Sequence, residues 1–127
     1  MAGGSPERGA AAAEFAMLAG LVSILMLAVM QLAFGLHLHN TATAHVVEGA
    51  RAGARADATP EDGARRAQEL ISRSLSGGGG VSVSSRRTVV DGVAVVEVTA
   101  TMPLPIVGPL GPGESMTVVG HAYAEDQ

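Results

Sequence analysis

Few side chains in this 127-residue sequence are placed to do chemistry. Cysteine is absent, which excludes a disulfide framework and thiolate metal centres. His37, His39 and His45 lie close together in the sequence, but His37 and His39 are two residues apart on an expected helix and so point in different directions. We therefore expect these histidines to anchor and solvate the helix end, and we predict no metal site and no cofactor.

The sequence also offers no convincing pairing of a nucleophile with a base. Ser84-Ser85 and His121 fall in different expected strands, far apart in the chain. The glycine run Gly77–Gly80 is not followed by the Lys-Ser or Lys-Thr pair of a phosphate-binding loop, so it is interpreted as a flexible linker. A net charge of −4 disfavours a nucleic-acid binder. We predict no enzymatic activity, no small-molecule substrate and no nucleic-acid partner.

The acid Glu14 is the exception, because it stands at the head of the long uncharged run Ala16–Leu36. As a helix this run spans about 31 Å, close to the ~30 Å hydrocarbon core of a bilayer. A chain this short cannot wrap such a helix on all sides, so the sequence predicts one membrane span. An ionisable side chain at the edge of a span is a functional candidate. The alternative is that Glu14 only marks the end of the span.

The residues around Glu14 resemble a known processing site. Gly9 is followed by four residues and then by Glu14 and Phe15, at the head of the apolar run. This arrangement is similar to that of type IV pilin-like proteins, which a membrane prepilin peptidase cuts after the glycine. The resemblance implies a cut between Gly9 and Ala10, which would make Glu14 the fifth residue of the mature chain and Phe15 the sixth.

The wider stretch Arg8–Arg55, which ends in EGARAGAR, resembles the TadE-like family of tight-adherence (Flp-type) pilus systems. The resemblance implies a minor pilin or pseudopilin that helps to assemble a pilus or secretion filament. Its implied partners are membrane lipid, a prepilin peptidase, other pilin-like subunits and the Tad assembly machinery. It also implies a single-pass protein of the cytoplasmic membrane whose amino terminus is cytoplasmic. In a bundle of such helices, the Glu14 carboxylate can pair with the α-amine of a neighbour's Ala10 and fix the axial register.

Two other interpretations of the apolar run stay open. A secretory signal peptide would be cut at Ala42-Thr43-Ala44, although the run is longer than the apolar region of such a peptide. A signal anchor would hold an extracytoplasmic binding domain that has no role in a filament. The arginines on the two sides of the run do not decide its orientation.

The segments that flank the span complete an α+β fold. Met1–Gly9 is short and polar and is expected to be disordered. The helical pattern continues beyond the span, although Gly49 and Gly53 each weaken a helix by roughly 1 kcal/mol relative to Ala. A second helix is predicted to begin at Thr59-Pro60-Glu61-Asp62, with Thr59 as N-cap, Pro60 in the first position and Asp62 closing a capping box. Ser76 and the glycines after it end this helix.

The dipeptide Asp91-Gly92 predicts a β-hairpin between Val81–Val90 and Val93–Met102. A two-residue turn places Arg86 opposite Glu97 on a polar face, and a one-residue slip would mix the polar and apolar faces. The predicted apolar face carries these residues: Val81, Val83, Val89, Ala94, Val96, Val98 and Ala100. Arg87 also falls on that face, which an edge position or a bulge would explain.

A third strand is expected near Ser115–Ala124, after a loop rich in Pro and Gly over Met102–Gly113. The predicted architecture is therefore a long amino-terminal transmembrane helix, a second helix and a small three-stranded antiparallel sheet, as in pilins. We expect a leader over 1–9, the membrane helix with its extension over 10–58, and an extracytoplasmic helix-and-sheet module over 59–127.

Overall fold

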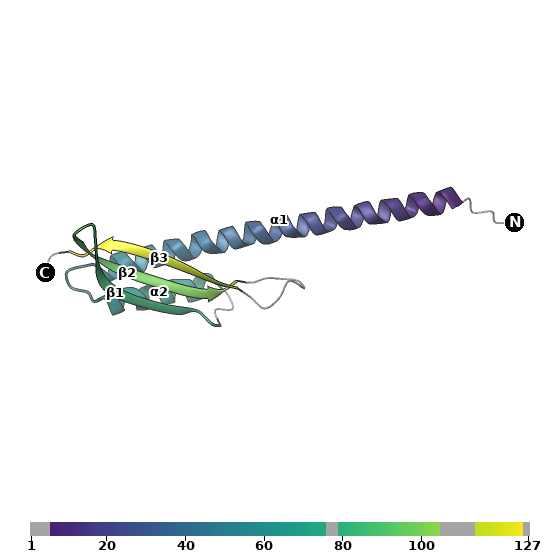
Figure 1. Cartoon of the computed structure of the whole chain (residues 1–127). Coiled ribbons are helices and arrows are strands. Elements are labelled where there is room, and N and C mark those ends of the chain that lie inside the picture. Colours follow the sequence, from purple (N-terminus) through teal and green to yellow (C-terminus); the bar gives the residue numbers. More distant parts are fainter. Residues whose placement is uncertain (1–5, 76–78, 105–113, 126–127) are drawn as a thin grey trace. The chain divides into compact units, whose positions relative to one another are not determined.

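The computed structural model describes residues 6–75, 79–104 and 114–125 and has the predicted α+β architecture (Figure 1). Two helices precede three strands: α1 Pro6–Gly53, α2 Pro60–Ser74, β1 Ser82–Val90, β2 Val93–Pro103 and β3 Ser115–Tyr123. The chain divides into two compact units between Phe34 and Gly35. The predicted extension of the membrane helix therefore shares a compact unit with α2 and the sheet.

The first unit, over residues 6–34, is entirely helical. Its large apolar side chains, from Phe15 to Phe34, are exposed, and the most apolar 18-residue window of α1 has a mean hydropathy of 2.3 with none of its residues buried. The hydroxyl of Ser23 donates to the carbonyl oxygen of Ala19 at 2.7 Å, so this polar group is satisfied within the helix. Among the described residues α1 is the one helix long and apolar enough to cross a membrane, as expected for a single-pass membrane protein.

The helix begins at Pro6, inside the segment expected to be disordered. The prediction was wrong for Pro6–Gly9, for two physical reasons. Proline fits the first position of a helix, because its φ is already helical and its missing N–H has no intrahelical partner to lose there. Glu7 places a negative charge in the first turn, where the helix dipole stabilises it.

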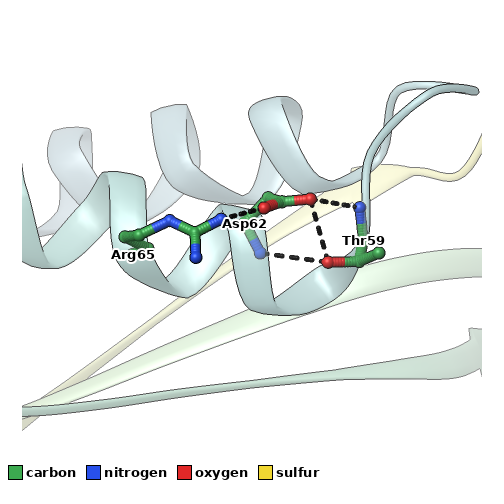
Figure 2. Close-up of polar contacts among 3 residues, drawn as sticks. All are labelled: Thr59, Asp62 and Arg65. Atoms are coloured by element: carbon green, nitrogen blue, oxygen red, sulfur yellow. Dashed lines mark hydrogen bonds and ion pairs between the residues drawn. The ribbon is translucent and has the colours of Figure 1, made fainter.

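In the second unit, α2 begins with the predicted capping box (Figure 2). The Thr59 hydroxyl accepts a hydrogen bond from the Asp62 N–H at 3.3 Å, and the Asp62 carboxylate accepts one from the Thr59 N–H at 2.9 Å. Arg65 forms an ion pair with the other carboxylate oxygen. The bonds from the Thr59 backbone and side chain, helped by Arg65, lower the pKa of Asp62 below its ordinary value. The helix ends at Ser74, just before the predicted stop.

The strands form one antiparallel sheet in the order β1-β2-β3, with the predicted hairpin register. Asp91 and Gly92 have φ of 52° and 80°, which is the left-handed conformation that a two-residue hairpin turn requires. β3 pairs with β2 over its whole length, which completes the expected three-stranded antiparallel sheet. β2 continues to Pro103, so it includes the first two residues of the expected loop, and residues 105–113 of that loop lie outside the described residues.

The core of the second unit is built on a stripe of α1 residues four apart, Leu38, Ala42, Val46 and Ala50, which Ala54 continues just after the helix. Ala67 and Ile71 from α2 join them, together with these sheet residues: Val96, Val98, Ala100, Met102 and Val118. Val89 and Ala94 do not belong to the core, although the predicted apolar face included them, because the buried residues on that face of β2 begin only at Val96. Arg87 is exposed, and its strand β1 is an edge strand, which is one of the two expected explanations.

A polar row crosses the other face of the sheet. Glu97 on β2 accepts from Arg86 Nε on β1 at 2.7 Å, and its second oxygen lies 2.8 Å from His121 Nε2 on β3. Arg86, and to a lesser degree His121, lowers the pKa of Glu97 below its ordinary value. Ionised Glu97 therefore stabilises the fold above the pKa of an unfolded glutamate, and this stabilisation is lost as the pH falls through the lowered folded pKa.

The two faces of the sheet should respond very differently to substitution. Val98→Asp should prevent the second unit from folding, because an unpaired buried carboxylate costs several kcal/mol. Glu97→Gln should reduce the free energy of unfolding by well under about 1 kcal/mol, because both partners of Glu97 are largely exposed. Urea unfolding of the detergent-solubilised chain, followed by pulse proteolysis, measures both effects. Equal damage from the two changes would contradict the assignment of the faces.

Candidate functional site

The candidate processing residues Gly9, Ala10, Glu14 and Phe15 lie in successive turns of α1, and all four are exposed. Glu14 shares a shallow surface with three apolar residues one and two turns further along: Met17, Leu18 and Leu21. No described residue forms an ion pair or a hydrogen bond with its carboxylate. The head of the helix thus presents an acid on an apolar surface, with no charge partner in the described part of its own chain.

The three histidines near the middle of α1 do not converge on one point. His37 and His39 are exposed, whereas His45 Nε2 lies 2.6 Å from the hydroxyl oxygen of Ser74, at the end of α2. The described residues contain no group of three or more His, Asp or Glu side chains arranged to hold a metal ion. His45 instead links the two helices, a contact that the sequence analysis did not anticipate.

α1 contacts α2 closely through residues that have no side chain or only a methyl group. We call Gly49 and Gly53 of α1, with Gly63 and Ala67 of α2, the glycine seam. A Cβ atom added at Gly49 would lie 2.6 Å from Ala67 Cβ and 2.6 Å from the Gly63 carbonyl oxygen. One added at Gly53 would lie 3.1 Å from Gly63 Cα. The two helix backbones are therefore in direct contact, as in membrane helix pairs with small residues four apart.

The same stretch of α1 also lies directly against the sheet. A Cβ atom added at Gly120 on β3 would lie 2.8 Å from the Val47 nitrogen and 2.9 Å from the Val46 carbonyl carbon. Just beyond the helix, the Glu125 N–H donates to the Ala54 carbonyl oxygen at 2.8 Å. Glycines thus permit close contacts of α1 with both α2 and β3.

The sequence analysis treated Gly49 and Gly53 only as residues that weaken a helix. The available signal was their spacing, because both Gly49–Gly53 and Gly63–Ala67 place small residues four apart on one helix face. Their weak helix propensity is offset by the packing that their lack of a side chain permits.

A model of the family described as TadE-like protein matches residues 9–55. Residues 9–55 form a TadE-like segment. This finding confirms the resemblance to that family over this stretch. The matched stretch contains the candidate processing residues, the apolar span and the α1 half of the glycine seam. Neither a curated protein nor a solved structure matches the chain.

Alanine substitutions along α1 should have a different effect on stability at the glycine seam than elsewhere in the helix. Gly49→Ala should lower the stability of the second unit by about 1–3 kcal/mol, because its Cβ would overlap Ala67 and the backbone of Gly63. Gly35→Ala is the matched control, since its Cβ would meet nothing within 4 Å. It should be neutral or stabilise the helix by up to about 1 kcal/mol. Urea unfolding with pulse proteolysis provides the comparison, and a Gly49→Ala protein as stable as the control would rule out tight packing at the seam.

Proposed function

We propose that the protein is a minor pilin or pseudopilin that helps to assemble a tight-adherence pilus or a related secretion filament. The TadE-like match over residues 9–55 carries the proposal. The exposed apolar helix and the acid at its head support it, because both are suited to packing against other helices in a membrane. The proposal gives the chain no catalytic role.

The first step in this proposal is a cut between Gly9 and Ala10 by a prepilin peptidase. Both residues lie in the opening turns of α1, next to the helix end whose first backbone N–H groups have no intrahelical partner. Glycine also lowers the stability of a helix relative to alanine. This stretch can therefore unwind to fit a peptidase at little cost, and the cut would leave a free α-amine on Ala10.

The second step is assembly through Glu14. A carboxylate at the edge of the hydrocarbon is unfavourable unless it is paired, and Glu14 has no partner among the described residues of its own chain. The α-amine of a neighbouring subunit's Ala10 would supply the opposite charge. Because residues 10 and 14 are four apart, this pairing would offset two parallel helices by about 6 Å along their axes. The alanines of Ala10–Ala13 permit a close approach of the helices.

In this proposal the amino terminus is cytoplasmic and the second unit lies outside the cytoplasmic membrane. The core of that unit argues against a secretory signal peptide cut at Ala42-Thr43-Ala44. Such a cut would remove Leu38 and Ala42, both of which are buried in the core. A signal anchor that holds an extracytoplasmic binding domain remains the second candidate function, because it needs only the exposed apolar helix and a folded outer unit.

Processing can be tested directly on the mature amino terminus. In cells with a prepilin peptidase, mass spectrometry should find a chain that begins at Ala10. Gly9→Leu should leave the chain uncut, because the bulky side chain would occupy the position of the residue that precedes the cut. A wild-type chain that keeps its first nine residues, or one that begins at His45, would contradict the proposed processing.

Assembly can be tested with the charge of Glu14. In cells that lack the protein, complementation with Glu14→Ala should restore processing and membrane insertion but few or no surface filaments, because the register contact is lost. Glu14→Asp, whose reach is one methylene shorter, should give an intermediate number. Glu48→Ala removes another exposed acid from α1 and serves as the control, which should restore filaments fully. Full rescue by Glu14→Ala would favour the signal anchor.

A further inference from the structure

The chain contains two Asp-Gly pairs, Asp62-Gly63 and Asp91-Gly92. Such a pair can react with itself, because glycine has no side chain to shield the amide nitrogen that follows the aspartate. This nitrogen attacks Cγ of the aspartic acid and forms a C–N bond, while the hydroxyl group of the carboxyl leaves with the amide proton as water. The product is a five-membered succinimide ring. The two pairs lie in opposite surroundings, so they should not react equally.

The pair Asp62-Gly63 is held in the first turn of α2 (Figure 2). The Asp62 carboxylate accepts hydrogen bonds from the N–H and the hydroxyl of Thr59, both at 2.9 Å, and it also pairs with Arg65. These contacts, those with Thr59 above all, lower the pKa of Asp62 and so favour the ionised form, which has no hydroxyl group to lose. Gly63 is buried, and its N–H donates to the Thr59 carbonyl oxygen at 3.3 Å. Both reacting groups of this pair are therefore occupied.

The pair Asp91-Gly92 has none of these restraints. Both residues are exposed at the tip of the β1–β2 hairpin. Within the described parts of the chain, no group forms an ion pair or a hydrogen bond with the Asp91 side chain, and none accepts a hydrogen bond from the Gly92 N–H. A Cβ atom added at Gly92 would meet nothing within 4 Å, so a ring has room to form there. Asp91 is also the one described residue other than glycine with a positive φ, a conformation that residues with a side chain rarely adopt.

We propose that Asp91 is a site of spontaneous modification, at which the bond to Gly92 rearranges through a succinimide to isoaspartate while Asp62-Gly63 stays intact. Water opens the ring at either of its two carbonyl carbons. Attack at the carbonyl carbon of the original main chain leaves Gly92 attached to Cγ, so the main chain then passes through Cβ and is one atom longer. Ring opening adds back the water that ring closure released. The α-carboxyl freed in this way is the group that an isoaspartyl methyltransferase recognises.

The longer main chain would disturb the hairpin turn. Val90 pairs with Val93 across this turn, and two residues with left-handed φ close it, so an additional main-chain atom no longer fits. Val90 and Val93 are exposed, whereas Val96 and Val98 further along β2 are fully buried. Isoaspartate at position 91 should therefore separate the two strands at the tip of the hairpin and leave the rest of the sheet paired.

The test compares the two Asp-Gly pairs within one molecule. The detergent-solubilised full chain is aged in warm buffer made with heavy-oxygen water, digested and analysed by tandem mass spectrometry. Ring opening should add one heavy oxygen to the peptide that contains Asp91 and should produce isoaspartate there. The peptide that contains Asp62 should be labelled roughly tenfold more slowly, because a capped helix must open before this pair can react. In concentrated guanidinium chloride both peptides should be labelled at similar rates, since the difference arises from the fold.

The effect on the hairpin is measured on the isoaspartate-containing fraction of the aged chain, separated by chromatography. Hydrogen exchange should be faster at the amides of Val90 and Val93 than in the fresh chain and should be unchanged at Val98. Asp91→Gly is the matched control, because a Gly-Gly pair also suits a two-residue turn but has no carboxyl to react. Ageing should leave hydrogen exchange in the Asp91→Gly protein unchanged.

Equal labelling of the two peptides in the folded chain would overturn the proposal. So would an Asp91 peptide that is labelled only in guanidinium chloride, because the turn would then protect the pair. Isoaspartate without faster exchange at Val90 and Val93 would contradict the expected disturbance of the turn. These readouts need no pilus, so they succeed or fail independently of the proposed function.

Discussion

The direct packing of the α1 backbone against α2 and β3 is the constraint on which the second unit depends. At Gly49, Gly53 and Gly63 two helices touch without intervening side chains, and at Gly120 the same helix touches a strand. The core residues of α1 can reach α2 and the sheet because of these close contacts. Two of them, Ala42 and Ala50, carry only a methyl group and could not bridge a wider separation of the elements.

Because of this packing, one continuous helix has an exposed apolar part followed by a part that is buried in the core of the second unit. The exposed large apolar residues of α1 end at Leu36, and its buried residues begin at Leu38. Before that point the helix surface is apolar all round, as a lipid-facing helix requires. After it, burial recurs every four residues and glycines replace larger side chains. The TadE-like match extends across both parts, so the matched segment includes the candidate membrane span and half of a helix–helix contact.

The features that could be predicted from the sequence are those set by neighbouring residues. Thr59 and Asp62 define the start of α2, and Asp91-Gly92 defines the register that brings Arg86 to Glu97. The glycine seam could not be derived in this way, because it depends on which distant helix meets Gly49. The contact of His45 with Ser74 could not be predicted for the same reason. The exposure of Val89 could not be predicted either, because periodicity shows which residues share a face of the strand but not how far along that face other elements cover it. The candidate site at Gly9 and Glu14 was predicted from a family resemblance, and its proposed partner is a second molecule.

The central claim is that α1 leaves the lipid near Leu36 and becomes a core helix from Leu38 onward. Because the chain has no cysteine, single cysteines can be placed from Leu32 to Ala50 and spin-labelled in membranes. Collisions with oxygen, which concentrates in lipid, should be frequent as far as Leu36. Collisions should then be rare at Leu38, Ala42, Val46 and Ala50. A water-soluble relaxation reagent should instead reach labels at Asn40, Ala44 and Glu48, which lie between those positions. Lipid contact that continues unbroken past Ala42, or accessibility without a four-residue period, would contradict this account.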